Sequence, residues 1–192
     1  MLQICPVREK DIPHLLKIYQ SYIDTSVTFE CRLPTLDEFT ERVRFIQRAY
    51  PYLVCREGEE IAGYAYAHRY QEREAYRWNA ELSVYLSPAC TGRGLGKLLY
   101  SALLEILRLQ NVQNVYGIVT SPNPASEGLH RSMGFSLLGC YHGTGYKWGQ
   151  WRDVQLFEKQ LGAHENPPRE FLPVGQLDRE RIREVCARFS VL

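Results

Sequence analysis

A glycine-rich loop between a strand-like run and a helix-like run is the part of this chain best suited to chemistry. The loop carries Gly92, Gly94 and Gly96, and a helical apolar pattern begins at Leu98. Glycine lets a backbone approach an anion closely, and the start of a helix offers unpaired N–H groups and the positive end of its dipole. The arrangement predicts a site for a phosphate-bearing cofactor. The alternative is a glycine-rich turn that only caps an ordinary helix.

The loop differs from two common nucleotide-binding loops. A P-loop has Gly-Lys followed by Ser or Thr, whose hydroxyl binds magnesium, whereas Gly96 and Lys97 are followed by Leu98. A Rossmann fingerprint has another glycine spacing and an acidic residue about 20 residues later. The strand-like run 114–119 supplies no such acid. The sequence therefore indicates neither class.

The run that precedes the loop, residues 80–86, alternates between apolar and polar side chains. This alternation predicts a strand whose two faces differ, because successive side chains of a strand point to opposite sides. One face is expected to pack and the other to face something polar. The apolar face carries Ala80, Leu82, Val84 and Leu86, and the opposite face carries Glu81, Ser83 and Tyr85.

Composition favours one globular unit with a small-molecule partner. The chain has 192 residues, 45% of them hydrophobic, which is ample for one core. Its formal net charge of +1 gives no basic field for nucleic acid. No apolar run approaches the ~20 residues of a membrane span and the first residues lack a signal pattern, so we expect a cytoplasmic protein with no membrane partner. The six scattered cysteines include no Cys-x-x-Cys pair and indicate neither disulfides nor a metal.

Hydrophobic periodicity predicts a mixed order of helices and strands. Beyond Gly162 a Pro-rich break precedes a short amphipathic helix over 177–189, so residues 163–192 are expected to form an extension that packs on the domain or on a partner subunit. The other expected elements are strand 4–7, helices 11–23 and 35–50, strands 52–56, 61–68 and 80–86, helix 98–107, strand 115–120, helix 125–133, and strands 137–141 and 154–161.

Two separated motifs in the expected order resemble the GNAT family of acetyl-CoA-dependent N-acetyltransferases. They are the strand with its glycine loop and the segment 123–135. Further stretches, such as 22–29 and 149–154, are similar to the phosphinothricin (methionine sulfoximine) acetyltransferase branch. We therefore expect residues 1–162 to form a GNAT domain. The resemblance implies an α/β (mixed α+β) fold, with a mostly antiparallel twisted sheet that splays at its central strand and is flanked by helices.

The resemblance also implies roles for three side chains in acyl transfer to an amine. An alkyl amine titrates near 10 and needs a base at neutral pH. Glu81 matches the glutamate that the branch uses as a general base, directly or through water. His130 and Tyr100 are candidates to protonate the departing thiolate. Other interpretations stay open: a structural ion pair for Glu81, a substrate contact or a packing role for His130, and a core position for Tyr100.

Acetyl-CoA is the cofactor that the resemblance implies, and no metal is expected. The backbone of 84–86 would stabilise the thioester oxygen and pair with the pantetheine arm, and the loop would hold the pyrophosphate. Thr91 stands where the family usually has Gln or Arg, so either Arg93 compensates or affinity is lower. The expected cofactor-binding residues are Val84, Tyr85, Leu86, Thr91, Gly92, Arg93, Gly94, Leu95, Gly96, Lys97, Asn123 and Ser126.

The acceptor implied by the resemblance is the primary amine of a small amino acid or analogue. Arg73 is the candidate to bind its carboxylate or phosphinate, since guanidinium matches such groups, unless it is only a solvated loop charge. Related enzymes are commonly dimers, so a homodimer is expected. Two alternatives stay open: another amine acceptor, such as a polyamine, an antibiotic or a protein N-terminus, or a non-catalytic acyl-CoA-binding module. The expected acceptor-binding residues are Phe29, Arg73, Tyr76, Ser83 and Tyr85.

Overall fold

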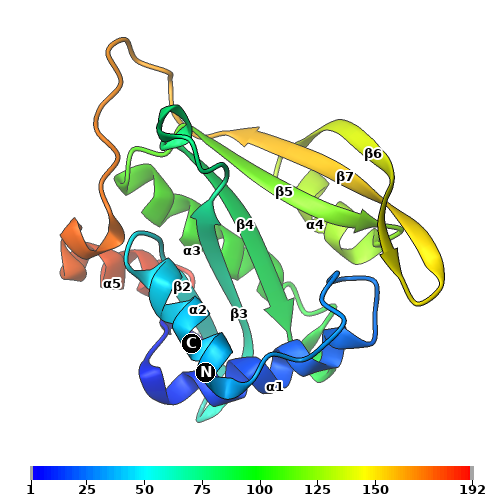
Figure 1. Cartoon of the computed structure of the whole chain (residues 1–192). Coiled ribbons are helices and arrows are strands. Elements are labelled where there is room, and N and C mark those ends of the chain that lie inside the picture. Colours follow the sequence, from blue (N-terminus) through cyan, green and yellow to red (C-terminus); the bar gives the residue numbers. More distant parts are fainter. Residues whose placement is uncertain (1, 191–192) are drawn as a thin grey trace.

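Seven strands form one mixed sheet within residues 2–190, the part of the chain that the computed structural model describes (Figure 1). Their order is β1-β2-β3-β4-β5-β7-β6, and each neighbouring pair is antiparallel except β4 and β5, which are parallel. The mostly antiparallel sheet expected from the sequence is confirmed. The strands are β1 (Leu2–Pro6), β2 (Tyr52–Glu57), β3 (Glu60–Arg69), β4 (Asn79–Leu86), β5 (Asn114–Ser121), β6 (Ser136–Lys147) and β7 (Gln150–Gln160).

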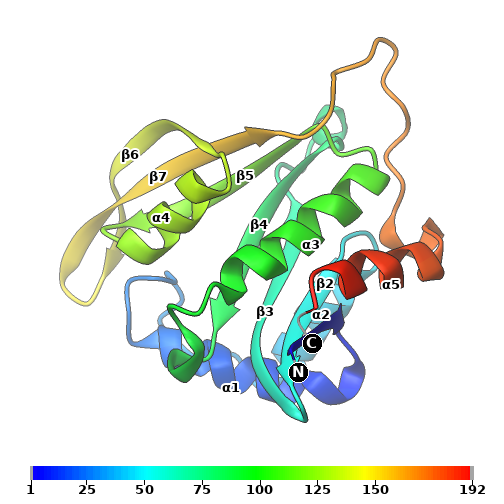
Figure 2. The same cartoon turned by 180° about the vertical axis from the view of Figure 1, so that it is seen from behind.

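Helices cover both faces of this sheet. Figure 1 shows two of them in front, and Figure 2 shows the other three on the opposite face. The front pair is α1 (Ile12–Ile23) and α2 (Leu36–Gln47), and the rear group is α3 (Leu95–Leu109), α4 (Pro124–Ser132) and α5 (Arg179–Arg188). The longest of these, α3, buries its leucine-rich face against β2, β3 and β4. The core therefore lies on both sides of the central strands.

Local signals place the start of α2 where the sequence predicted it. Thr35 accepts a hydrogen bond from the backbone N–H of Glu38 at 3.2 Å, and the Glu38 carboxylate accepts one from the N–H of Thr35 at 2.7 Å. This reciprocal capping box satisfies two of the N–H groups that a helix start leaves unpaired. Phe39, Val43 and Ile46 then form the buried face.

The last two strands are much longer than the sequence pattern indicated. We expected strands over 137–141 and 154–161, but β6 continues to Lys147 and β7 begins at Gln150. The pattern is obscured because the register shifts between Tyr141 and Gly145 and because most β6 side chains are exposed. The result is a long hairpin that projects beyond the sheet (Figure 1).

The C-terminal extension packs on the same chain. Ile182, Val185 and Cys186 of α5 are buried, and this helix contacts β1 and α3. The hydroxyl of Ser190 accepts a hydrogen bond from the backbone N–H of Ile4 at 2.9 Å. The helix begins at Arg179 rather than at 177, because the side chain of Asp178 caps it.

Candidate active site

The parallel pairing of β4 with β5 ends early and leaves a gap in the middle of the sheet. Only Asn79–Glu81 pairs with Asn114–Tyr116, whereas β4 stays paired with β3 as far as Leu86. A cavity of about 60 Å³ lies at this gap. Its lining includes Leu82 and Val84 from one face of β4 and Ser83 and Tyr85 from the other. Because these side chains alternate, the cavity connects the two faces of the sheet.

The backbone of β4 turns unpaired groups toward this gap. The N–H of Ser87 donates to the carbonyl oxygen of Ala62 in β3 at 2.8 Å. Backbone directions alternate along a strand, so the N–H groups of Val84 and Leu86 point away from β3. The N–H of Leu86 donates to the hydroxyl of Tyr22 at 3.3 Å, and that hydroxyl donates to the Leu86 carbonyl at 2.6 Å. The N–H of Val84 therefore faces the gap with no strand beside it.

Glu81 lies where the gap opens, next to an imidazole. Its Oε1 is 3.6 Å from Nε2 of His68, which stands opposite Glu81 in β3. Burial disfavours the charge of His68, but the nearby carboxylate of Glu81 outweighs it, so the pKa of His68 is raised above its ordinary value. The Glu81 side chain is 19% exposed, so the carboxylate is half-buried and still accessible. Glu81 is thus paired with a titratable group rather than with a permanent cation.

Aromatic side chains surround the same face of β4 beyond Glu81. Tyr66, opposite Ser83 in β3, is half-buried, and removal of its hydroxyl from water raises its pKa to about 12. Tyr85 makes edge contacts with Tyr19 and Tyr22, with ring centroids 5.2 and 5.3 Å apart. Burial raises the pKa of Tyr85 well above its ordinary value, so its hydroxyl stays protonated. This face offers apolar surface with hydroxyl donors.

The glycine loop has the backbone geometry that an anion site requires. Gly92 and Gly94 have φ angles of 74° and 79°, in the left-handed region that favours glycine. Gly94 is the N-cap of α3 and has no side chain with which to cap it. The first N–H groups of a 15-residue helix are therefore left without a side-chain cap, and they fit a pyrophosphate.

Two polar side chains of the loop, those of Arg93 and Thr91, already have partners within the protein. Arg93 forms an exposed ion pair with Glu57 and is already partly neutralised. Thr91 donates its hydroxyl to the carbonyl of Pro88 at 3.0 Å, and Lys97 is exposed. Leu95 and Gly96 are buried, and a Cβ on Gly96 would lie 3.3 Å from Leu129 of α4. Gly96 therefore allows close packing of α3 on α4.

His130 and Tyr100 line the rear wall of the cavity. Nδ1 of His130 lies 2.8 Å from the carbonyl oxygen of Ser126, and a carbonyl only accepts, so Nδ1 carries a proton. Burial lowers the pKa of His130, which favours the neutral ring with Nε2 unprotonated. Burial, reinforced by the charge of Glu81, raises the pKa of Tyr100. Tyr100 thus keeps its hydroxyl proton, whereas Nε2 of His130 carries none.

The segment before His130 holds its ring against β5. Asn123 caps α4, its Oδ1 accepting from the N–H of Ser126 at 3.2 Å. A Cβ on Gly117 would lie 2.1 Å from Nε2 of His130, so the ring packs directly on the bare backbone of β5. Asn123 and Ser126 also line the cavity, beside Thr120. The two sequence motifs therefore meet at one place.

The predicted acceptor residues are divided between the cavity and the surface. Ser83 and Tyr85 line the cavity. Phe29 does not line it, and its ring packs on Gly145 of β6. Arg73 and Tyr76, by contrast, are exposed at the short 3-10 turn after β3 and do not line the cavity.

Sequence reasoning missed His68, Val27 and Thr120 as residues of this site. His68 ends a strand-like run, but only the register of β3 on β4 puts it opposite Glu81. Val27 and Thr120 line the cavity through their position in the fold. Alternation along β3 could have shown which face His68 occupies, and nothing in the sequence indicated its partner.

One group of side chains outside the cavity has the composition of a metal site. Potential ligand atoms of Cys140, His142 and Asp153 lie within 4.8 Å of one another on the β6–β7 hairpin. They already bond to each other and to backbone: Asp153 accepts from His142 at 3.1 Å and from the N–H of Gly143 at 2.8 Å. All six cysteines of the chain are free. No helix in the described part of the chain is long and apolar enough to cross a bilayer.

A splayed sheet, a cavity at the splay and an uncapped helix start are the features expected of an acyl-CoA-dependent acyltransferase. Comparison with known proteins gives the family. Residues 4–156 match the model of the acetyltransferase (GNAT) domain, and the chain belongs to the GNAT acetyltransferases.

Two relatives are named as acetyltransferases of phosphinothricin or of methionine sulfoximine. The chain is 33% identical over 177 residues to the phosphinothricin N-acetyltransferase of Streptomyces viridochromogenes, an alignment that spans 92% of this chain and 96% of that one. It is 32% identical to the L-methionine sulfoximine/L-methionine sulfone acetyltransferase of Pseudomonas aeruginosa, over 82% and 94% of the two chains.

A solved structure of similar fold holds the expected cofactor. It is the phosphinothricin acetyltransferase of Sinorhizobium meliloti in complex with acetyl-CoA, which is 32% identical, with a TM-score of 0.83 over 89% of this chain and 95% of that one. The chain is accordingly an acetyltransferase of a family that uses acetyl-CoA, and it has the GNAT fold.

Proposed function

We propose that this protein transfers the acetyl group of acetyl-CoA to the primary amine of a small amino acid or analogue, of the phosphinothricin or methionine sulfoximine type. The observation that carries the proposal is the gap between β4 and β5: Glu81 is the last β4 residue paired with β5, the cavity begins at the next residue, Leu82, and α3 has an uncapped start. Such a cavity lets an amine on one side reach a thioester on the other. Relatives that act on such acceptors, about one third identical over nearly their full lengths, support the acceptor class.

Glu81 is the general base in this proposal. The acceptor amine must lose a proton before its nitrogen can attack the thioester carbon, and Glu81 takes that proton directly or through one water. His68, 3.6 Å away, keeps the carboxylate oriented.

The backbone of β4 stabilises the charge that develops on the thioester oxygen. Acetyl-CoA supplies the activated acyl group, and the C–S bond breaks as the new C–N bond forms. The N–H of Val84 faces the gap with no strand beside it, which makes it the best placed donor of the expected stretch Val84–Leu86. Tyr22 already bonds to Leu86 on that side.

Tyr100 is our choice for the group that protonates the departing thiolate. Its hydroxyl is protonated at neutral pH, and its raised pKa makes it a weak acid, so it acts first as a hydrogen-bond donor to the sulfur and gives up its proton as the thiolate leaves. His130 is neutral, with its proton on Nδ1 directed at Ser126. We therefore assign His130 to positioning, since it packs at a centroid distance of 5.6 Å from Tyr100. The loop 91–97, with Asn123 and Ser126, anchors the phosphates and the pantetheine arm.

A thiol-release assay over a panel of amines tests the proposal. Methionine sulfoximine, phosphinothricin, several natural amino acids, a polyamine and a tripeptide are each mixed with acetyl-CoA. The proposal predicts the highest kcat/KM for the small amino acids or analogues. A higher kcat/KM for the polyamine or the tripeptide would show that the proposed acceptor class is wrong. Thermal protection by acetyl-CoA, with no thiol released for any amine, would indicate a binding module instead of an enzyme.

We also propose a homodimer and the division into a catalytic domain, residues 1–162, and a bracing extension, residues 163–192. Four exposed aromatic side chains on the β6–β7 hairpin support a partner subunit there: Tyr141, Tyr146, Trp148 and Trp151. Light scattering tests the dimer, and a monomer at micromolar concentration would refute it. A chain ending at Gly162 should unfold at a lower temperature than the full chain, and equal midpoints would refute the bracing role.

A further inference from the structure

Lys147 has a buried ammonium group that donates its hydrogen bonds to backbone, and its Nζ lies 5.8 Å from the ring centroid of Trp148. It ends β6, is 2% exposed, and donates to three carbonyl oxygens: those of Ile23 at 2.6 Å, Thr25 at 2.7 Å and Thr28 at 2.7 Å. Lysine is rarely buried without a partner, and the three carbonyls satisfy all three N–H bonds of its ammonium group. Burial lowers the pKa of Lys147. Burial of this cation is thus compensated by one neighbouring segment.

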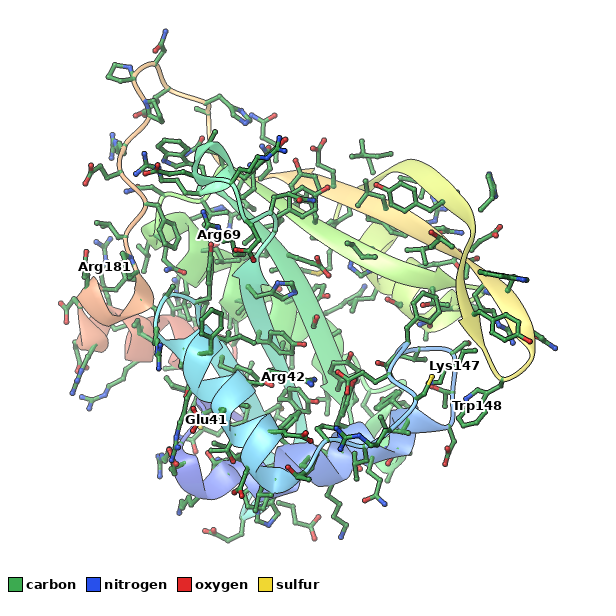
Figure 3. All side chains as sticks on the ribbon, viewed as in Figure 1. Glu41, Arg42, Arg69, Lys147, Trp148 and Arg181 are labelled. Atoms are coloured by element: carbon green, nitrogen blue, oxygen red, sulfur yellow. The ribbon has the colours of Figure 1, made fainter. Side chains whose placement is uncertain are left out.

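That segment consists of the last residue of α1 and the start of the α1–α2 loop, which spans residues 24–35. The carbonyl of Ile23 lies at the C-terminal end of α1, where the helix dipole favours a cation. Figure 3 shows Lys147 between this loop and the tip of the hairpin, beside Trp148. The side chain of Lys147 therefore joins segments more than a hundred residues apart in sequence.

A second contact joins the same two segments. A Cβ on Gly145 would lie 2.1 Å from the ring of Phe29, so the ring rests on bare backbone of β6. The φ of Gly145 lies outside the left-handed region, so its backbone conformation does not itself require glycine. A side chain at position 145 is excluded because it would occupy the space of the Phe29 ring.

The α1–α2 loop forms part of the acceptor side of the cavity. Val27 is one of the cavity-lining residues. The hydroxyls of Thr28 and Tyr19 are 2.8 Å apart, and the ring of Tyr19 contacts Tyr85 of β4. A shift of the loop would therefore move the wall against which an acceptor lies, while the glycine loop and α3 would keep their places.

We propose that Lys147 is a positioning residue that clamps the α1–α2 loop onto the β6–β7 hairpin and so confines the site to small amine acceptors. The activity measurements that test this clamp rest on the proposed function, and the amide-exchange measurement does not. Without the ammonium group, three buried carbonyl oxygens would have no partner, and the loop would open toward water to hydrate them. An opened loop binds a small acceptor more weakly and admits a larger one.

The experiment compares Lys147→Met with Gly145→Ala, and with Lys17→Met as a control that removes one exposed charge elsewhere. The first substitution removes the clamp, and the second pushes Phe29 off the hairpin while keeping Lys147. For each variant, KM is measured for methionine sulfoximine and for acetyl-CoA, together with the kcat/KM ratio of methionine sulfoximine to a tripeptide. Amide exchange of residues 24–29 in the full chain is measured without any acceptor.

Both test variants should raise KM for methionine sulfoximine about tenfold and leave KM for acetyl-CoA within about twofold, with the ratio shifted toward the tripeptide. Amide exchange of residues 24–29 should be faster, and the control should match the wild type. Unchanged exchange in folded Lys147→Met would overturn the clamp even if no amino acid is an acceptor. Should that variant not fold, an unchanged acceptor KM in Gly145→Ala would overturn the selectivity role.

Discussion

Replacing Glu81 by glutamine tests the base assignment with little change in shape. Glutamine keeps the size of the side chain but cannot take a proton from the acceptor amine. General-base catalysis contributes about a hundredfold to ten-thousandfold in rate. At about 1.36 kcal/mol per tenfold, the activation free energy should rise by about 3–5 kcal/mol. The loss should appear in kcat with both substrates saturating, because the amine still binds.

Stability should change much less than activity in this variant. The Glu81 side chain is partly exposed, and its partner lies 3.6 Å away, at the long end for an ion pair. The free energy of unfolding should therefore fall by no more than about 1 kcal/mol. A matched control is Glu59→Gln, an exposed carboxylate outside the site. Denaturant unfolding of the wild type, Glu81→Gln and Glu59→Gln separates a folding defect from a catalytic one.

The neighbouring His68 gives a second, independent readout. In the wild type the pKa of His68 is raised above its ordinary value. The stabilisation from the pair is therefore fully present below about pH 6.5 and is lost as the pH rises through the raised pKa. In Glu81→Gln the NMR titration of His68 should shift to lower pH. An unchanged titration would refute the pair.

The assay is thiol release with methionine sulfoximine or the best acceptor of the panel, from about pH 6 to about pH 9. If Glu81→Gln retained kcat within about twofold of the control at every pH, the base assignment would be wrong. Glu81 would then have a structural role in its pair with His68.

Three further substitutions test other parts of the site. Gly94→Ala places a side chain at a φ of 79° at the start of α3, so KM for acetyl-CoA should rise about tenfold while KM for the acceptor stays the same. An unchanged KM for acetyl-CoA would remove this loop from the cofactor site. Tyr100→Phe keeps the packing but loses the donor, so kcat should fall at least about tenfold in steady-state assays, and full activity would exclude Tyr100 as the acid. Gly117→Ala should displace His130 and lower the free energy of unfolding by about 1–3 kcal/mol in denaturant titrations. Gly128→Ala is the control: no atom lies within 4 Å of the added methyl group, so this variant should neither displace His130 nor lose stability. Equal free energies of unfolding for the two variants would contradict the packing described for His130.

Local signals made much of the fold predictable. The capping box at Thr35, the alternation over 80–86 and the glycine loop each depend on a few neighbouring residues, and each element lies close to where the pattern indicated. The hairpin of β6 and β7 was underestimated because its outer residues do not alternate and its register shifts at Tyr141. Exposed strands give weak patterns, since neither face is fully buried.

The site was only partly predictable, for a physical reason. Side chains on one strand or one loop, such as Glu81 and Gly94, follow from local sequence. Pairs across strands do not: His68 meets Glu81 only through the register of β3 on β4, and Lys147 meets the end of α1 across more than a hundred residues. Arg73 was a candidate to bind the carboxylate or phosphinate of the acceptor, and it lies exposed at the turn after β3.

A crystal structure of the protein with coenzyme A and an N-acetylated amino acid tests the central claim most directly. We predict the pyrophosphate on the backbone of 91–96, the sulfur at the gap between β4 and β5, and the product nitrogen facing Glu81 directly or through one water. The product carbonyl oxygen should lie near the N–H of Val84. A product bound away from Glu81, or coenzyme A bound outside the gap, would contradict the account.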